Sequence, residues 1–187
     1  MAVGKEYIER DNYILMDYYN KLILRVFISL AIVLLPIDLF YFLLLKPTLY
    51  TSSIFLSQYV PRITEDSLII NNVALKFIPA CIATLAYVLL LLLVLLTKDI
   101  GFKNGAKIFL SGAIIIFIAN IIRIDSLIYV YFEYGSNIFD RLHLFIWQFL
   151  SGIFVAAVWI FLSHVYKIKA IPIYDDIAEL YRRRKTN

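Results

Sequence analysis

The sequence has few charged residues and almost none of the residues that build metal sites or disulfides. Only 17% of its 187 residues are charged, and it contains one cysteine and two histidines. A single cysteine excludes an intramolecular disulfide, and the sequence has neither a CxxC pair nor a His-rich metal spacing. We therefore expect neither a metal nor another cofactor. The lone thiol, Cys81, is either a packed apolar group or a nucleophile.

What the sequence does contain is long apolar runs. Hydrophobic residues make up 62% of the chain, and the runs recur as far as residue 168. This excludes an ordinary soluble domain and also a soluble domain behind a signal peptide. The net charge of +4 does not indicate nucleic acid as a partner, because the basic residues lie at the ends of apolar runs and in one terminal cluster. The composition predicts an all-α integral membrane protein.

Four apolar runs are long enough, or nearly so, to cross a hydrocarbon core of about 30 Å. They cover residues 22–45, 73–96, 106–122 and 144–166. The segments 1–21 and 169–187 are amphipathic, and we expect helices on the membrane surface there. The stretch SIFLSQYV in the first connection is too short to span and suits another interfacial helix. We therefore predict about four transmembrane helices within residues 22–168, with amphipathic helices at both termini and in the first external loop.

Lysine and arginine are distributed unequally between the two sides of this predicted bundle. Of the 18 basic residues, the side away from the termini carries Lys46, Arg62, Lys76, Arg123 and Arg141. Loops rich in lysine and arginine stay in the cytoplasm. We therefore expect a multi-pass protein of the cell membrane with both termini cytoplasmic.

This orientation brings three reactive side chains to the outer ends of different spans. Cys81 falls in the outer part of the second span, Arg123 at the outer end of the third and His143 at the outer start of the fourth. Singly, each has a structural interpretation, as a packed thiol, an arginine anchor or an interfacial histidine. Together they are the groups that acyl transfer to a thiol needs, because the thiol requires a base and the oxyanion a positive donor. The sequence predicts an active site facing outside.

The order of these residues resembles a known family. Cys81 in a span, Asn120-Ile-Ile-Arg123 followed by Ile124, and His143 at the start of the next span resemble the exosortase/archaeosortase family of membrane cysteine transpeptidases. The likeness covers about residues 70–165. It implies that a thioester forms on the cysteine when an exported protein with a hydrophobic C-terminal tail is cleaved. The new carboxyl end would pass to an acceptor, which in the archaeal branch is a lipid.

The resemblance also implies roles for individual residues. Cys81 is the nucleophile, Arg123 the cationic activator and His143 the third member. Arg141 is the alternative third member, because the archaeal branch can place an arginine at that position. Asn120 is one turn from Arg123 and is placed to orient its guanidinium.

Asp38 and two non-enzymatic functions complete the sequence interpretation. Asp38 lies too deep in the first span for an uncompensated charge, so it is either protonated or paired with Arg123, Lys76 or Arg141. A membrane scaffold would use such an ion pair structurally and would only pack the thiol. A small transporter would line a pathway with the same charges, but the polar groups gather at one end of the spans, which argues against a transporter.

Overall fold

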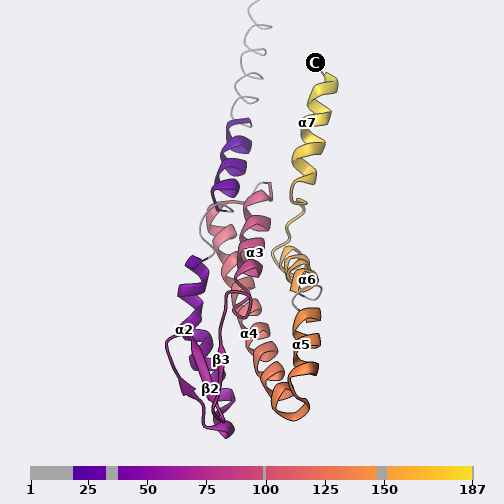
Figure 1. Cartoon of the computed structure of the whole chain (residues 1–187). Coiled ribbons are helices and arrows are strands. Elements are labelled where there is room, and N and C mark those ends of the chain that lie inside the picture. The colour runs from indigo at the N-terminus through magenta and orange to yellow at the C-terminus, as the bar shows by residue number, and fades with distance from the viewer. Residues whose placement is uncertain (1–18, 33–37, 99, 147–150, 187) are drawn as a thin grey trace, which may run out of the picture.

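The computed structural model describes residues 19–32, 38–98, 100–146 and 151–186, and these are mostly helical (Figure 1). A first helix covers residues 19–32. The elements that follow are α2 (Asp38–Phe55), the 3-10 helix η1 (Ser57–Tyr59), β1 (Arg62–Ile63), β2 (Ser67–Ile70), β3 (Val73–Lys76), α3 (Thr84–Leu96), α4 (Phe102–Tyr134), α5 (Ser136–Phe145), α6 (Ser151–Val165) and α7 (Tyr174–Thr186). The helical content agrees with the all-α prediction, apart from the short strands.

Helix α4 is the centre of the fold. It is 33 residues long, and at about 1.5 Å per residue it extends for roughly 50 Å. Helices α3 and α6 pack against it around a core that includes Leu90, Ile108 and Leu162. At Gly112 the three helices approach so closely that a Cβ atom would lie 2.6 Å from Leu90 Cδ2. The missing side chain at this position allows the close approach.

The three strands form a small antiparallel sheet in the order β1-β2-β3. A two-residue turn joins β2 to β3, and both Asn71 and Asn72 have the positive φ that such a hairpin turn needs. Leu68 and Ile70 alternate with more exposed neighbours along β2 and are fully buried. They pack in one core cluster with Leu49 of α2 and with Ile124 of α4. The sheet is therefore fixed to the helices and is not a separate unit.

The structure corrects the bounds of the predicted spans. The predicted span 22–45 ends too early, because α2 continues to Phe55, and residues 33–37 lie outside the described part. The predicted span 73–96 begins as a strand and becomes helical only at Thr84. The span 106–122 is a fragment of the much longer α4. Residues of the span 144–166 belong to α5 and α6, with 147–150 outside the described part.

The interfacial helix predicted at SIFLSQYV is also absent, because these residues form the end of α2 and then η1. Among the described residues, α4 is the one helix long and apolar enough to cross a membrane by length and composition. Shorter apolar helices cover Leu39–Phe55, Thr84–Leu96 and Ser151–Val165. Four complete transmembrane helices are therefore not shown.

The terminal helices leave the bundle at the end opposite the sheet (Figure 1). Most of the predicted segment 1–21 lies outside the described residues, whereas the segment 169–187 does contain a helix, α7. Arg25 of the first helix donates a hydrogen bond of 2.6 Å to the Asp176 carboxylate of α7. This partly buried ion pair joins the two helices.

Candidate functional site

Cys81 lies in a compact turn between β3 and α3, not inside a helix as the sequence interpretation assumed. The turn closes on itself, because the Cys81 amide donates to the Ile78 carbonyl at 2.9 Å. The Thr84 hydroxyl, in the first turn of α3, donates to the Pro79 carbonyl at 3.2 Å. Ala83 adopts a left-handed conformation with φ of 58°, which bends the chain into the helix. The thiol is therefore carried by a short loop with a defined shape.

Helix α4 binds this turn through two side chains. The Asn120 side-chain amide donates to the Cys81 carbonyl at 3.1 Å. The Arg123 guanidinium donates through Nη2 to the same carbonyl at 2.7 Å and to the Ala80 carbonyl at 3.1 Å. Both residues therefore hold the backbone of the turn, as the one-turn spacing of Asn120 and Arg123 allows. Hydrogen bonds from a charged donor are the stronger kind, so Arg123 contributes most to this attachment.

Two buried polar atoms of this pair have no hydrogen-bond partner among the described residues. They are Nε of Arg123 and Oδ1 of Asn120. Buried polar atoms in native proteins are nearly always satisfied, and exceptions concentrate at sites that bind or react with something. At least one N–H of the guanidinium therefore has no partner after the side chain has bound the turn.

Cys81, Arg123 and His143 line one cavity of about 230 Å³. They come from the turn, from α4 and from α5, so three separate segments meet there. The sequence led us to expect this meeting. The remaining walls are side chains of β3, apolar residues of α4, and Phe139, whose ring stacks on the His143 ring with centroids 5.5 Å apart.

The surroundings of His143 favour its neutral form. Burial lowers the pKa of His143 below its ordinary value of 6.5, and the nearby positive charge of Arg123 lowers it further. The Asp140 carboxylate, one turn earlier on α5, opposes this shift. A neutral imidazole at physiological pH is the form that accepts a proton from a thiol.

The other predicted residues take different positions. Arg141 is exposed and does not line the cavity that contains Cys81. Asp38 begins α2, but its side chain lies outside the described residues, so its predicted ion pair is not placed. Lys76, one of its predicted partners, instead pairs with Asp66 at 3.0 Å.

Sequence reasoning missed two contributions from the sheet side of the site. Lys76 was expected as a possible partner of Asp38, yet it lines the cavity together with Cys81 and His143. The pair with Asp66 raises the pKa of Lys76. The pKa of Asp66 is lowered, mainly by a hydrogen bond from Ser67 and next by one from Lys76. The Tyr41 hydroxyl of α2 donates to the Phe77 carbonyl at 2.9 Å, just before the turn. The paired asparagines between two short apolar runs were the signal for this hairpin.

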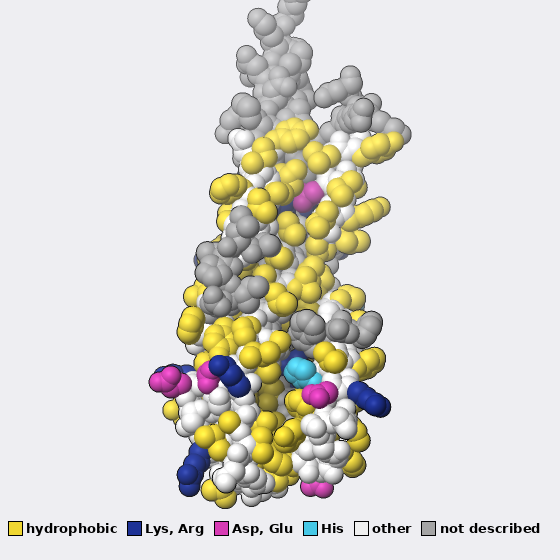
Figure 2. Space-filling model, viewed as in Figure 1, with side chains coloured by type: hydrophobic (Ala, Val, Ile, Leu, Met, Phe, Trp, Pro, Cys, Tyr) yellow, Lys and Arg dark blue, Asp and Glu magenta, His cyan; other side chains and the backbone are white. Residues whose placement is uncertain are grey.

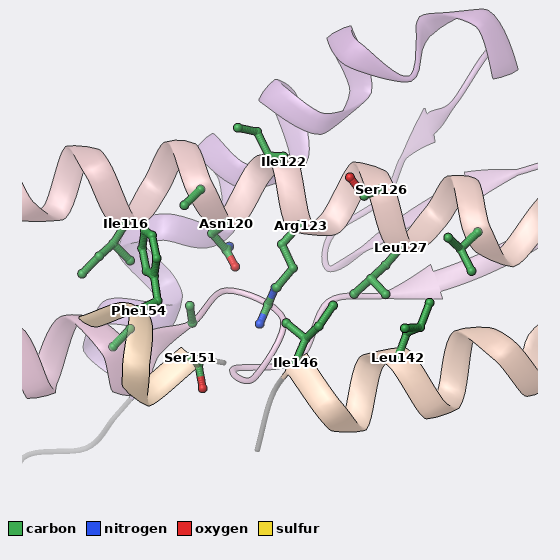
Figure 3. A pocket seen from close by; sticks show the side chains of 14 residues that line it. Ile116, Asn120, Ile122, Arg123, Ser126, Leu127, Leu142, Ile146, Ser151 and Phe154 are labelled. Atoms are coloured by element: carbon green, nitrogen blue, oxygen red, sulfur yellow. The ribbon is translucent and has the colours of Figure 1, made fainter. Parts of the chain in front are cut away.

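A second, apolar cavity of about 380 Å³ lies on the other side of Arg123 (Figure 3). Its walls come from α3, α4, α5 and α6, and they include Ala86, Leu127, Leu142 and Phe154. Figure 3 shows Arg123 pointing from α4 between these helices. Arg123 lines both cavities, so the apolar groove adjoins the chamber that contains Cys81.

No protein family, curated protein or solved structure is found to match the chain. Within the described part of the chain there is also no group of three or more His, Cys, Asp or Glu residues that would hold a metal. The functional argument therefore rests on the geometry of the residues themselves.

Proposed function

We propose that the protein is a membrane-embedded cysteine peptidase or transpeptidase with Cys81 as its nucleophile. The observation that supports this most directly is the meeting of Cys81, Arg123 and His143, from three segments, in one cavity. A thiol, a neutral imidazole and a fixed cation are the groups that thiol acyl transfer requires. The spacing of these residues also resembles the exosortase/archaeosortase family.

The reaction proceeds in two acyl transfers. Cys81 Sγ attacks the carbonyl carbon of the substrate peptide bond while His143 takes the thiol proton. The tetrahedral intermediate collapses, His143 returns that proton to the leaving amine, and a thioester remains on Cys81. An acceptor amine or hydroxyl then attacks the thioester, His143 removes its proton, and the thiol is released in its original form.

Arg123 serves this reaction in two ways. Its bonds to the Ala80 and Cys81 carbonyls set the position of the turn, so the sulfur is presented at a fixed place. Its guanidinium, which lines the cavity beside Cys81, is the cation we assign to the developing oxyanion. Asn120 is a positioning residue, because it acts through the same carbonyl.

The surface of the molecule supports a membrane location. Leu110, Ile114, Ile118 and Ile122 recur every four residues along α4, and each is at least 54% exposed. Figure 2 shows hydrophobic side chains over most of the visible described surface, with charged side chains gathered mainly toward the end that carries the sheet and α5. An apolar surface of this extent requires a partner or lipid to cover it. We propose a multi-pass protein with both termini cytoplasmic and the site outside.

The apolar groove beside Arg123 suggests the form of the substrate. The groove is large and almost without polar walls, and it adjoins the chamber that contains the thiol. We propose that it receives the hydrophobic C-terminal tail of an exported protein, so that the bond to be cleaved reaches Cys81. The acceptor in this proposal is a membrane lipid.

The test is capture of an acyl-enzyme in cells that express the full chain with an exported protein bearing a hydrophobic C-terminal tail. Wild type should form a hydroxylamine-sensitive adduct and should shorten the substrate. Cys81→Ser should do neither. Because the chain has one cysteine, any thioester must lie on Cys81.

Arg141 and His143 offer a matched pair of variants for the third position. His143→Gln should reduce processing by about 10²- to 10⁴-fold, the usual contribution of a general base. Arg141→Gln should leave processing unchanged, because that side chain is exposed outside the cavity. Full processing by Cys81→Ser would overturn the proposal and favour a scaffold in which the thiol only packs.

A further inference from the structure

We propose that the protein binds a phosphate-bearing anion in a third cavity, near the start of α4 and far along that helix from Arg123. This cavity has a volume of about 450 Å³ and is lined by Lys98, Lys167 and Lys169. Among the described residues that line it, lysine is the one charged type. The inference does not depend on the chemistry proposed for the thiol.

The end of α6 explains why two of these lysines face the same cavity. Lys167 adopts a left-handed conformation with φ of 54°. The Ile168 amide then donates back to the Ser163 carbonyl at 2.8 Å, and the Lys167 amide donates to the His164 carbonyl at 3.2 Å. These bonds form a helix-terminating motif in which the residue after the left-handed one is apolar and packs inward. Ile168 does pack on the core, with one lysine on each side of it in the sequence.

The opposite wall comes from the start of α4. Asn104 in its first turn lines the cavity, and Gly101 at the N-cap makes no side-chain hydrogen bond to the helix. The free amides of a helix start carry partial positive charge, which adds to the field of the lysines. Tyr166, another lining residue, shares a hydrogen bond of 2.9 Å with Ser111 of α4, so the two walls are joined.

The chemistry of these walls selects phosphate. Lysine ammonium groups bind phosphate as compact point charges, and several of them can surround its oxygens at once. Basic pockets between helices at the cytoplasmic side of membrane proteins bind phosphorylated lipid head groups. In the proposed orientation this cavity lies on the cytoplasmic side, but a soluble phosphate would meet the same lysines. The source is decided by experiment.

The test compares two double variants of the purified full chain in neutral detergent. Lys167→Gln/Lys169→Gln removes two lining charges, whereas Lys103→Gln/Lys107→Gln removes two exposed charges of α4 that do not line the cavity. Thermal unfolding is followed with short-chain phosphatidic acid, short-chain phosphatidylcholine or inorganic phosphate, at constant ionic strength. A ligand that binds the folded protein raises the unfolding temperature.

Phosphatidic acid should stabilise wild type and the Lys103/Lys107 variant equally, and phosphatidylcholine should do so much less. Losing two lysines from the site should weaken the apparent affinity by roughly thirtyfold. If inorganic phosphate also stabilises the protein, the site binds phosphate in general. If only phosphatidic acid does so, the site binds a lipid head group. If the lining variant does not fold, Lys169→Gln alone should weaken binding by roughly fivefold.

Two results would overturn the inference. One is equal weakening in both double variants, which would indicate attraction to the overall charge of this end of the molecule. The other is that neither phosphatidic acid nor inorganic phosphate stabilises the wild-type protein.

Discussion

At the scale of single residues, the contacts of Arg123 depend on the shape of its guanidinium and not on its charge alone. Its Nη2 atom bonds two carbonyls of the Cys81 turn at once. A lysine would keep the charge but lacks the planar arrangement of donors.

Arg123→Lys should therefore reduce substrate processing about ten- to a hundredfold, which corresponds to losing a charged hydrogen bond of about 1.5–3 kcal/mol. The readout is processing together with the alkylation rate of Cys81, which reports on one site because the chain has one cysteine. Tyr129→Phe, at an exposed position of α4 that lines neither cavity, is the control and should change neither. Processing by Arg123→Lys at the wild-type rate would show that a positive charge is sufficient.

His143 provides a pH prediction. Because burial and Arg123 lower the pKa of His143, the neutral base persists below pH 6.5. The rate of acylation should fall only when the pH drops through this lowered pKa. Asp140→Asn removes the carboxylate that raises the pKa of His143, so the acid limb should move to lower pH. A pH–rate profile of both proteins tests this, and an acid limb that moves upward would contradict the assignment.

The lowered pKa of His143 also makes the stability of the fold depend on pH. The unfolded chain binds a proton at His143 more readily than the native protein does, since the native pKa is the lower one. The free energy of unfolding should therefore decrease as the pH falls below about 6.5, and His143→Gln should weaken that dependence.

At the scale of secondary-structure elements, the sequence was a better guide to which residues lie together than to the helices and turns on which they lie. The meeting of Cys81, Arg123 and His143 could be predicted, because apolar runs and basic loops indicate which ends of the helices lie on the same side. The hairpin was missed because its second strand, Val73–Lys76, was taken as the start of the membrane span 73–96. The bonds from Arg123 to backbone carbonyls could not be predicted, because they depend on the shape of the turn before α3.

Packing at Gly112 gives a prediction at this scale. Gly112→Val should lower the free energy of unfolding by about 1–3 kcal/mol, because its side chain would collide with Leu90 and Leu162. Gly152→Ala is the matched control in α6, where a Cβ atom meets nothing within 4 Å. It should be neutral or stabilising by at most about 1 kcal/mol, since alanine favours helix. Denaturant or thermal unfolding measures both, and equal effects would exclude a tight contact at Gly112.

At the scale of the whole molecule, composition predicted an apolar protein but not the lengths of its helices. Within the described residues, α3 is 13 residues long, because the chain before it is used for the turn that carries Cys81, and α6 ends at Val165, where the turn at Lys167 follows. Hydropathy sums the apolar residues of a segment and does not register where the backbone changes direction.

Site-directed labelling tests the membrane location. In a Cys81→Ser background, cysteine introduced at Ile118, 54% exposed on α4, should resist a charged maleimide in proteoliposomes. Cysteine at the exposed Glu133, near the other end of α4, should react. Cysteine at Lys103 should react only from the side opposite to Glu133. Rapid labelling of all three positions from one side would contradict a transmembrane α4.

Helix α4 contributes residues to both proposed sites and so fixes the distance between them. Asn104 and Arg123 are separated along the helix by roughly 28 Å, which is close to the thickness of a typical hydrocarbon core of about 30 Å. A rigid helix cannot change this separation when the lipid changes. A bilayer with much shorter or longer acyl chains would place one of the two sites at the wrong depth, so α4 would act as a gauge of membrane thickness.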